Sequence, residues 1–215
     1  MDVHFCPQCT KILTLARQGD YFSFLGVPRK LNLDVSDLEQ RFRALSRQFH
    51  PDYFYNATPA ERRSSLERSS YLNDAYRTLR QPMSRLEYLL SLEGMDRRRV
   101  ERPNQAPQDN AVVPAALLEE VFALNEELDA VREIRAGGVP ADDWQARLLA
   151  ARQPIERKRD EHEAQLQELF AKWDALVDGG RDDDRREVLN ALRERMLERN
   201  YILNLLAGIE REMNS

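Results

Sequence analysis

The feature that most constrains the fold is an apolar stripe that stops at a His-Pro-Asp corner. Four large apolar residues recur with the spacing of one helix face: Leu38, Phe42, Leu45 and Phe49. Pro51 disfavours the helical conformation for the residue before it, so this helix must end at His50. A second helix pattern begins at residues 58–61, a capping box with proline at the first helical position. The pattern predicts two antiparallel helices joined by a short loop that begins with His50, Pro51 and Asp52.

Three arginines in the same helix, Arg41, Arg43 and Arg47, lie off the apolar stripe and are expected to face water. By themselves they would be interpreted as an ordinary solvated helix face. The setting of the corner gives them a further meaning. The corner is preceded by the segment Tyr21-Phe22-Ser23-Phe24-Leu25-Gly26-Val27. It is followed by the segment Leu72-Asn73-Asp74-Ala75-Tyr76-Arg77-Thr78-Leu79.

In order and spacing, these three pieces resemble the J-domain family, the co-chaperones of DnaK-type heat-shock protein 70 ATPases. The resemblance implies that His50, Pro51 and Asp52, with Arg41, Arg43 and Arg47 beside them, dock on the ATPase domain of that chaperone. One residue departs from the usual pattern, because Tyr53 stands where many J-domains have lysine. Exposed charges of this kind set the rate and orientation of encounter more than affinity.

Composition limits the class of protein. The chain has 215 residues, of which 42% are hydrophobic and 32% charged, as expected for one or two globular domains. No apolar run is long enough for a membrane span, and residues 1–5 do not form a signal or transit peptide. Two cysteines make no disulfide framework, so a cytoplasmic location is expected. A mildly basic front half and an acidic back half suggest different protein partners. Nucleic-acid binding is not expected, because the sequence has no dense basic stripe.

The sequence predicts an all-α fold in which an N-terminal J-domain helical hairpin precedes a C-terminal three-helix bundle. The expected divisions are an N-terminal segment (1–20), the J-domain (21–94), a proline-rich linker (95–113) and the bundle (114–215). Ser36 and Glu39 form a second capping box near the start of the first hairpin helix. Helices of the hairpin domain are expected near residues 21–26, 34–49, 59–79 and 83–94.

In the bundle, the first helix is expected over 114–136 and the third over 184–213. The second is expected to contain Trp144 and Leu148, to be interrupted near Pro154 and to end at 179–180. The predicted core stripe of the first is Leu117, Val121, Leu124, Leu128 and Val131. The predicted inward positions of the third are Leu189, Leu192, Met196, Leu203 and Leu206. His162 falls on the apolar side of the second helix, where a hydrogen-bonded core histidine is expected.

Two places have more apolar surface than a narrow bundle seam needs. Leu118 and Phe122 lie beside the first stripe, rimmed by Glu119 and Glu126. A second stripe on the last helix consists of Tyr201, Ile202, Leu205 and Ile209. Each is either part of a wide core face or a hydrophobic docking patch with an acidic rim.

Two segments narrow the resemblance to the HscB subfamily, the iron–sulfur cluster co-chaperones. The fourth helix of that subfamily is similar to Arg80-Gln81-Pro82-Met83-Ser84-Arg85-Leu86-Glu87-Tyr88-Leu89-Leu90-Ser91-Leu92-Glu93-Gly94. The start of its C-terminal bundle is similar to Leu124-Asn125-Glu126-Glu127-Leu128-Asp129. The resemblance implies that the bundle binds the scaffold protein on which clusters are built, through Leu118, Phe122, Glu126 and Tyr201. Glu119 and Ala123 depart from the family pattern.

The N-terminal segment contains a lone Cys6-Pro7-Gln8-Cys9 motif with His4 upstream. Zinc requires four ligands, and His4, Cys6 and Cys9 supply at most three nearby. Some longer HscB-type proteins have a metal module with two such cysteine pairs, of which this chain has one. A vestigial end, a metal site within one chain or shared between two, and a thiol redox site all remain open. No cofactor is expected to be required, with zinc at Cys6 and Cys9 as the possible exception.

These inferences combine in one hypothesis. The chain is expected not to be an enzyme, because no nucleophile or general-base constellation accompanies His50. It would stimulate the ATPase of a DnaK/HscA-type chaperone and deliver the cluster scaffold to it, promoting cluster assembly and transfer. Two alternatives remain: a general J-domain protein with a different client, and a thiol or metal protein built on Cys6 and Cys9.

Overall fold

The computed structural model describes residues 4–6, 8, 11–13, 19–95, 117–138 and 141–214. The described chain is all-α, as predicted, apart from an isolated antiparallel bridge between Phe5 and Ile12. It forms two compact units, residues 1–96 with 173–181, and residues 97–172 with 182–215. All but the first residue of the expected 95–113 linker lies outside the described residues. No helix within the described ranges is long and apolar enough to cross a membrane.

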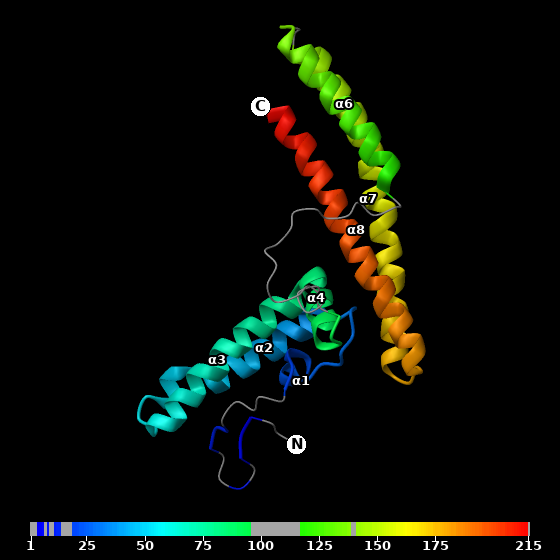
Figure 1. The fold of residues 1–215 in the computed structure, drawn as a ribbon. Coiled ribbons are helices and arrows are strands. Elements are labelled where there is room, and N and C mark those ends of the chain that lie inside the picture. The colour runs from blue at the N-terminus through cyan, green and yellow to red at the C-terminus, as the bar shows by residue number, and fades with distance from the viewer. Residues whose placement is uncertain are drawn as a thin grey trace, which may run out of the picture. The chain divides into compact units, whose positions relative to one another are not determined.

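The first unit is built on two long helices that run side by side, α2 (Val35–Phe49) and α3 (Pro59–Arg80) (Figure 1). The short 3-10 helix η1 (Pro51–Phe54) joins them, and α4 (Pro82–Leu92) follows α3. The predicted stripe packs as expected, with Leu38 and Phe49 fully buried and Phe42 stacked on Tyr76 at a ring separation of 4.3 Å. The Thr58 capping box is confirmed, since Thr58 and Glu61 cap each other's backbone amides.

The predicted Ser36–Glu39 capping box is wrong. Asp34 is the N-cap of α2, and its carboxylate accepts hydrogen bonds from the amides of Ser36 and Asp37. Aspartate two residues before serine satisfies the same orphan amides, so the helix begins at Val35. The first helix, α1 (Tyr21–Leu25), ends at Gly26, whose φ of 66° is in the left-handed region that glycine adopts without strain.

The first unit also includes residues 173–181, which come from the end of α7 (Ala141–Val177) and the turn after it. The indole of Trp173 donates a hydrogen bond to the carbonyl of Arg29 at 2.8 Å. The carboxylate of Asp174 accepts from the amides of Leu31 and Asn32 at 2.6 and 2.9 Å. These bonds satisfy backbone groups in the loop between α1 and α2, so that loop is completed by a segment some 140 residues later in the chain.

The second unit contains α6 (Leu118–Ala136), most of α7, and α8 (Asp182–Asn214). The predicted α6 stripe is confirmed as core, where it meets three α7 residues: Trp144, Leu148 and Ile155. The apolar stripe on α8 is also core, because Ile202 and Ile209 are buried and Tyr201 and Leu205 pack beside them. Burial on α8 follows Leu189, Leu192, Ile202 and Ile209, whereas Met196, Leu203 and Leu206 are half-buried.

Two predictions about α7 need correction. The helix is continuous through Pro154 rather than interrupted there. Leu148 and Ile155 are buried on either side of the proline, so tertiary packing offsets its cost to the helix. His162 is buried as expected, but neither ring nitrogen has a hydrogen-bond partner within the described chain. Its Nε2 lies 3.5 Å from a carboxylate oxygen of Glu198 on α8.

Candidate functional site

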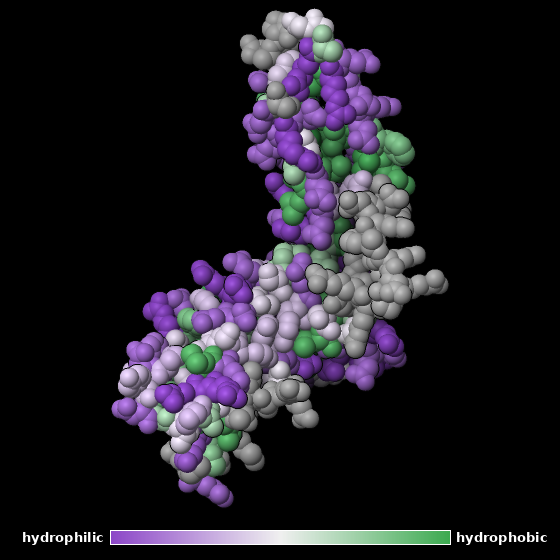
Figure 2. All heavy atoms as spheres, turned by 60° about the vertical axis from the view of Figure 1, so that its left-hand side comes forward, coloured by the Kyte–Doolittle hydropathy of each residue, from purple (hydrophilic) through white to green (hydrophobic). Residues whose placement is uncertain are grey.

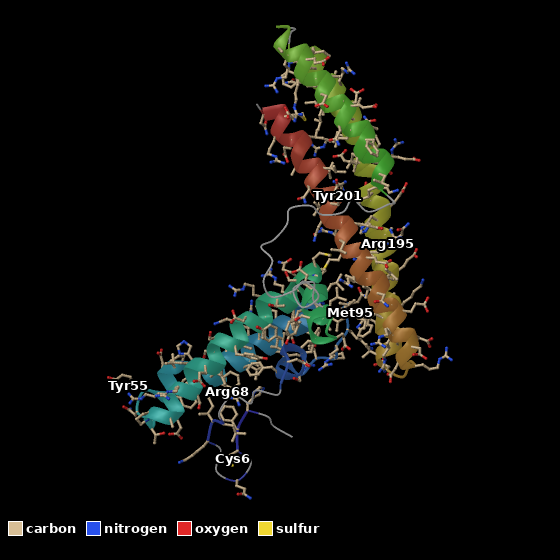
Figure 3. All side chains as sticks on the ribbon, in the orientation of Figure 1. Cys6, Tyr55, Arg68, Met95, Arg195 and Tyr201 are labelled. Atoms are coloured by element: carbon tan, nitrogen blue, oxygen red, sulfur yellow. The ribbon has the colours of Figure 1, made fainter. Side chains whose placement is uncertain are left out.

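The His-Pro-Asp corner lies at an exposed turn of the α2–α3 hairpin. His50 leaves the helix with φ −59° and ψ 127°, the extended conformation that Pro51 imposes on the residue before it. The side chains of His50 and Asp52 are 52% and 86% exposed. Tyr55, at the end of η1, marks the tip of the hairpin in Figure 3. The corner is therefore available to a partner protein.

Local hydrogen bonds fix how the corner presents its two polar side chains. The amide of Asp52 donates to Nδ1 of His50 at 3.4 Å, and one carboxylate oxygen of Asp52 lies 3.4 Å from the same nitrogen. The amide of Tyr53 donates to the carbonyl of His50 at 3.0 Å. The corner thus presents an imidazole and a carboxylate together, which suits recognition of a polar surface.

The three predicted arginines all lie on the exposed face of α2. Arg41 donates to Asp37 and to the carbonyl of Gly26, and Arg43 pairs with Glu39 one turn earlier. Their side chains are nevertheless 43% and 68% exposed, and Arg47 is also exposed. Exposed pairs four residues apart on a helix contribute only about 0.3–0.5 kcal/mol. A partner's carboxylates can therefore replace Asp37 and Glu39 at small cost.

Three of the four predicted scaffold-binding residues share one face of α6. Leu118 and Phe122 are 40% and 67% exposed, and Glu126 lies exposed one turn further along. The face drawn in Figure 2 is mostly hydrophilic, and apolar side chains gather in a strip along part of the second unit. Tyr201 lies on α8, half-buried against the core. An exposed phenylalanine beside an exposed leucine is typical of a protein-binding patch.

The predicted metal ligands are placed differently from one another. His4 is buried, and its Nδ1 lies 2.8 Å from a guanidinium nitrogen of Arg68. Cys6 is half-buried, and its amide donates to the carbonyl of Lys11. Cys9 lies outside the described residues. No group of three or more metal-ligating side chains occurs in the part of the chain that the structure describes. Zinc at Cys6 and Cys9 therefore stays a prediction.

Comparison with known proteins places this geometry in a family. Residues 20–88 match the DnaJ domain model. The fold is similar to the crystal structure of human co-chaperone protein HscB, with a TM-score of 0.62, 24% identity, and coverage of 98% of this chain and 90% of that one. It is also similar to chaperone HscB from Vibrio cholerae, with a TM-score of 0.53, 30% identity, and coverage of 90% of this chain and 96% of that one. The chain belongs to the HscB family of co-chaperones.

HscB membership gives the chain a partner. The chain is a J-domain co-chaperone of a heat-shock protein 70 ATPase that acts in iron–sulfur cluster biogenesis. Two exposed aromatic side chains follow the corner in this HscB-type chain, Tyr53 at 74% and Tyr55 at 76% exposure. The sequence shows that Tyr53 replaces the usual lysine, but it gives no sign that both rings face outward.

This HscB-type chain also has a groove that the sequence did not predict. It lies between α6 and α7 and encloses about 590 Å³ over an apolar floor that includes Ala123, Ala150 and Ile155. Glu127 and Arg147 at its rim form an ion pair at 2.9 Å. The groove arises where two helices pass each other, and small residues such as alanine carry no distinguishing signal in a single sequence.

Proposed function

We propose that this chain carries the iron–sulfur cluster scaffold protein to its heat-shock protein 70 partner and stimulates that partner's ATPase. The bundle binds the scaffold through Leu118 and Phe122, with Glu126 and Tyr201 at the edge of the contact. The J-domain presents the His-Pro-Asp corner to the ATPase. Hydrolysis then closes the chaperone on the scaffold and promotes cluster transfer. The supporting observation is that the corner and the α6 patch are both exposed, on separate units.

In this proposal the chain itself catalyses nothing. It shifts the partner ATPase between conformations by binding one of them better than the other. ATP hydrolysis by the partner takes place in the cytoplasm, and its stimulation needs no cofactor on this chain. Zinc held by Cys6 and Cys9 would be a structural addition, which metal analysis of the wild type against a Cys6→Ala, Cys9→Ala double variant tests directly.

The ATPase assay tests the J-domain half of the proposal. Asp52→Asn removes the carboxylate charge at the exposed corner and is expected to abolish stimulation of the chaperone, while scaffold binding stays at the wild-type level. Asp183→Asn is the matched control, because it makes the same change at an exposed position at the start of α8. Undiminished stimulation by the Asp52→Asn variant would rule the mechanism out.

Scaffold binding tests the bundle half. Burial of Phe122 against the scaffold is expected to contribute about 1.5–3 kcal/mol, so Phe122→Ala should weaken binding by roughly tenfold or more. Since Phe122 is 67% exposed, helix content by circular dichroism should not change. Leu149→Ala, at a 50% exposed position on α7, is the control. Equal scaffold affinity of wild type and Phe122→Ala would favour a general J-domain protein with a different client.

A further inference from the structure

Residues 4–6 and 11–13 pair with each other and pack against the J-domain, and we call this pair the N-terminal hairpin. The amide of Leu13 donates to the carbonyl of His4 at 3.0 Å, and the amide of Cys6 donates to the carbonyl of Lys11 at 2.9 Å. Phe5 and Ile12 form the antiparallel bridge between these bonds. A two-stranded hairpin of this length is not stable alone in water. Its stability must come from the surface on which it packs, and Ile12 is buried in the J-domain core.

Arg68 on α3 holds this N-terminal hairpin. Its side chain is 2% exposed and points from α3 toward the segment that carries Cys6 (Figure 3). Its Nε donates to the carbonyl of Leu13 at 2.8 Å, and Nη1 lies 2.8 Å from Nδ1 of His4. A buried guanidinium is costly unless its donors are satisfied, so the hairpin supplies part of what makes burial of Arg68 tolerable. The hairpin and Arg68 therefore depend on each other.

The same contacts converge on Phe49, the residue before the corner. The guanidinium of Arg68 lies 5.6 Å from the centroid of the Phe49 ring, and the His4 ring packs edge-on against it at 5.0 Å. On the other side, the hydroxyls of Ser65 and Ser69 donate to the carbonyl of Phe49 at 2.7 and 2.9 Å. Phe49 is thus fixed at its ring by the hairpin and at its carbonyl by α3. The direction in which the chain leaves toward His50 is set by this residue.

We propose that the N-terminal hairpin and Arg68 position the His-Pro-Asp corner for stimulation of the chaperone ATPase. The DnaJ family model begins at residue 20, so the hairpin is an addition to the J-domain. Arg68 is a positioning residue that acts through Phe49 and does not touch the chaperone. This inference rests on the proposed function, because it requires that the corner stimulate an ATPase.

The experiment compares Arg68→Lys and His4→Ala with wild type in the full chain. Lysine keeps the charge but loses the fork that reaches Leu13 and His4 together. Both variants are expected to lower the maximal stimulation by about fivefold or more, because a hydrogen bond to a buried charged group is lost. Scaffold affinity is expected to stay unchanged, and the His50 ring resonances to shift. Arg77→Ala, 81% exposed on the same helix, is the control and should leave stimulation and the His50 resonances unchanged.

Each variant is assayed only if circular dichroism shows that its helix content equals that of the wild type. If Arg68→Lys does not fold, His4→Ala alone decides, since it leaves α3 intact. Wild-type maximal stimulation and unshifted His50 resonances in a folded variant would overturn the inference, as would a lower melting temperature with unaltered stimulation. If the wild type itself fails to stimulate the chaperone, the proposed function fails instead, so the two failures are distinguishable.

Discussion

Within the second unit, the imidazole of His162 is buried between α7 and α8, and its surroundings shift its pKa. Burial lowers its pKa below the ordinary value of 6.5, and the carboxylate of Glu198 opposes that shift. The positive charges of Arg195 and Arg199, also on α8, lower the pKa in the same direction as burial. The folded state therefore prefers the neutral imidazole, and the unfolded chain binds a proton more readily.

The sign of the pH dependence follows from this preference. A histidine whose folded pKa is lowered contributes stability above its unfolded pKa and loses that contribution as the pH falls through the folded value. The free energy of unfolding should therefore decrease from about pH 7.5 to pH 5.5, and His162→Leu should flatten the decrease. Urea titrations at both pH values measure it. His50→Gln, at an exposed position, is the control, and an unchanged pH dependence in His162→Leu would contradict the prediction.

Residues whose role is local could be predicted from sequence, and residues whose role depends on distant partners could not. The corner at His50 could be predicted from three consecutive residues, because Pro51 forces the helix to end whatever the rest of the chain does. Arg68 gave no signal, since Leu13 and His4, which its guanidinium contacts, lie more than fifty residues away. His162 was correctly placed in the core, but its missing hydrogen bond depends on where α8 passes.

At the scale of elements, α7 shows how packing overrides local propensity. Proline inside a helix removes a backbone hydrogen bond and clashes with the preceding turn, yet α7 continues through Pro154. The sequence predicted a break there because the proline is visible locally. The buried Leu148 and Ile155, which pack against α6 and α8, are what keep the two halves in one helix.

This cost should be recoverable by mutation. Pro154→Ala restores the amide and removes the clash, so the free energy of unfolding is expected to rise by about 1–3 kcal/mol. Urea denaturation measures the change, and Gln153→Ala at the exposed neighbouring position is the control. A fall in stability on Pro154→Ala would mean that the core is packed around the proline ring, which also lines the α6–α7 groove.

At the scale of the whole molecule, the proposed function requires two sites on one chain. In that proposal, stimulation of the ATPase uses the corner at Asp52, and delivery of the scaffold uses the patch at Phe122. Linking the two sites covalently raises the effective concentration of one partner near the other. Two separate chains that each retain one working site cannot reproduce this effect.

A mixing experiment tests the requirement. An equimolar mixture of Asp52→Asn and Phe122→Ala variants is expected to lack the extra ATPase stimulation that wild type shows when scaffold is present. The double variant and the wild type at the same total concentration serve as controls. Full recovery of the scaffold-dependent stimulation by the mixture would show that delivery and stimulation are independent activities.

The completion of the α1–α2 loop by Trp173 and Asp174 has a consequence for biosynthesis. A nascent chain that has emerged from the ribosome only as far as residue 96 has no indole for the carbonyl of Arg29 and no carboxylate for the amides of Leu31 and Asn32. The first unit therefore cannot form all of its hydrogen bonds until residues 173–181 have been translated. Because the corner precedes those residues, it leaves the ribosome before the unit that contains it is complete.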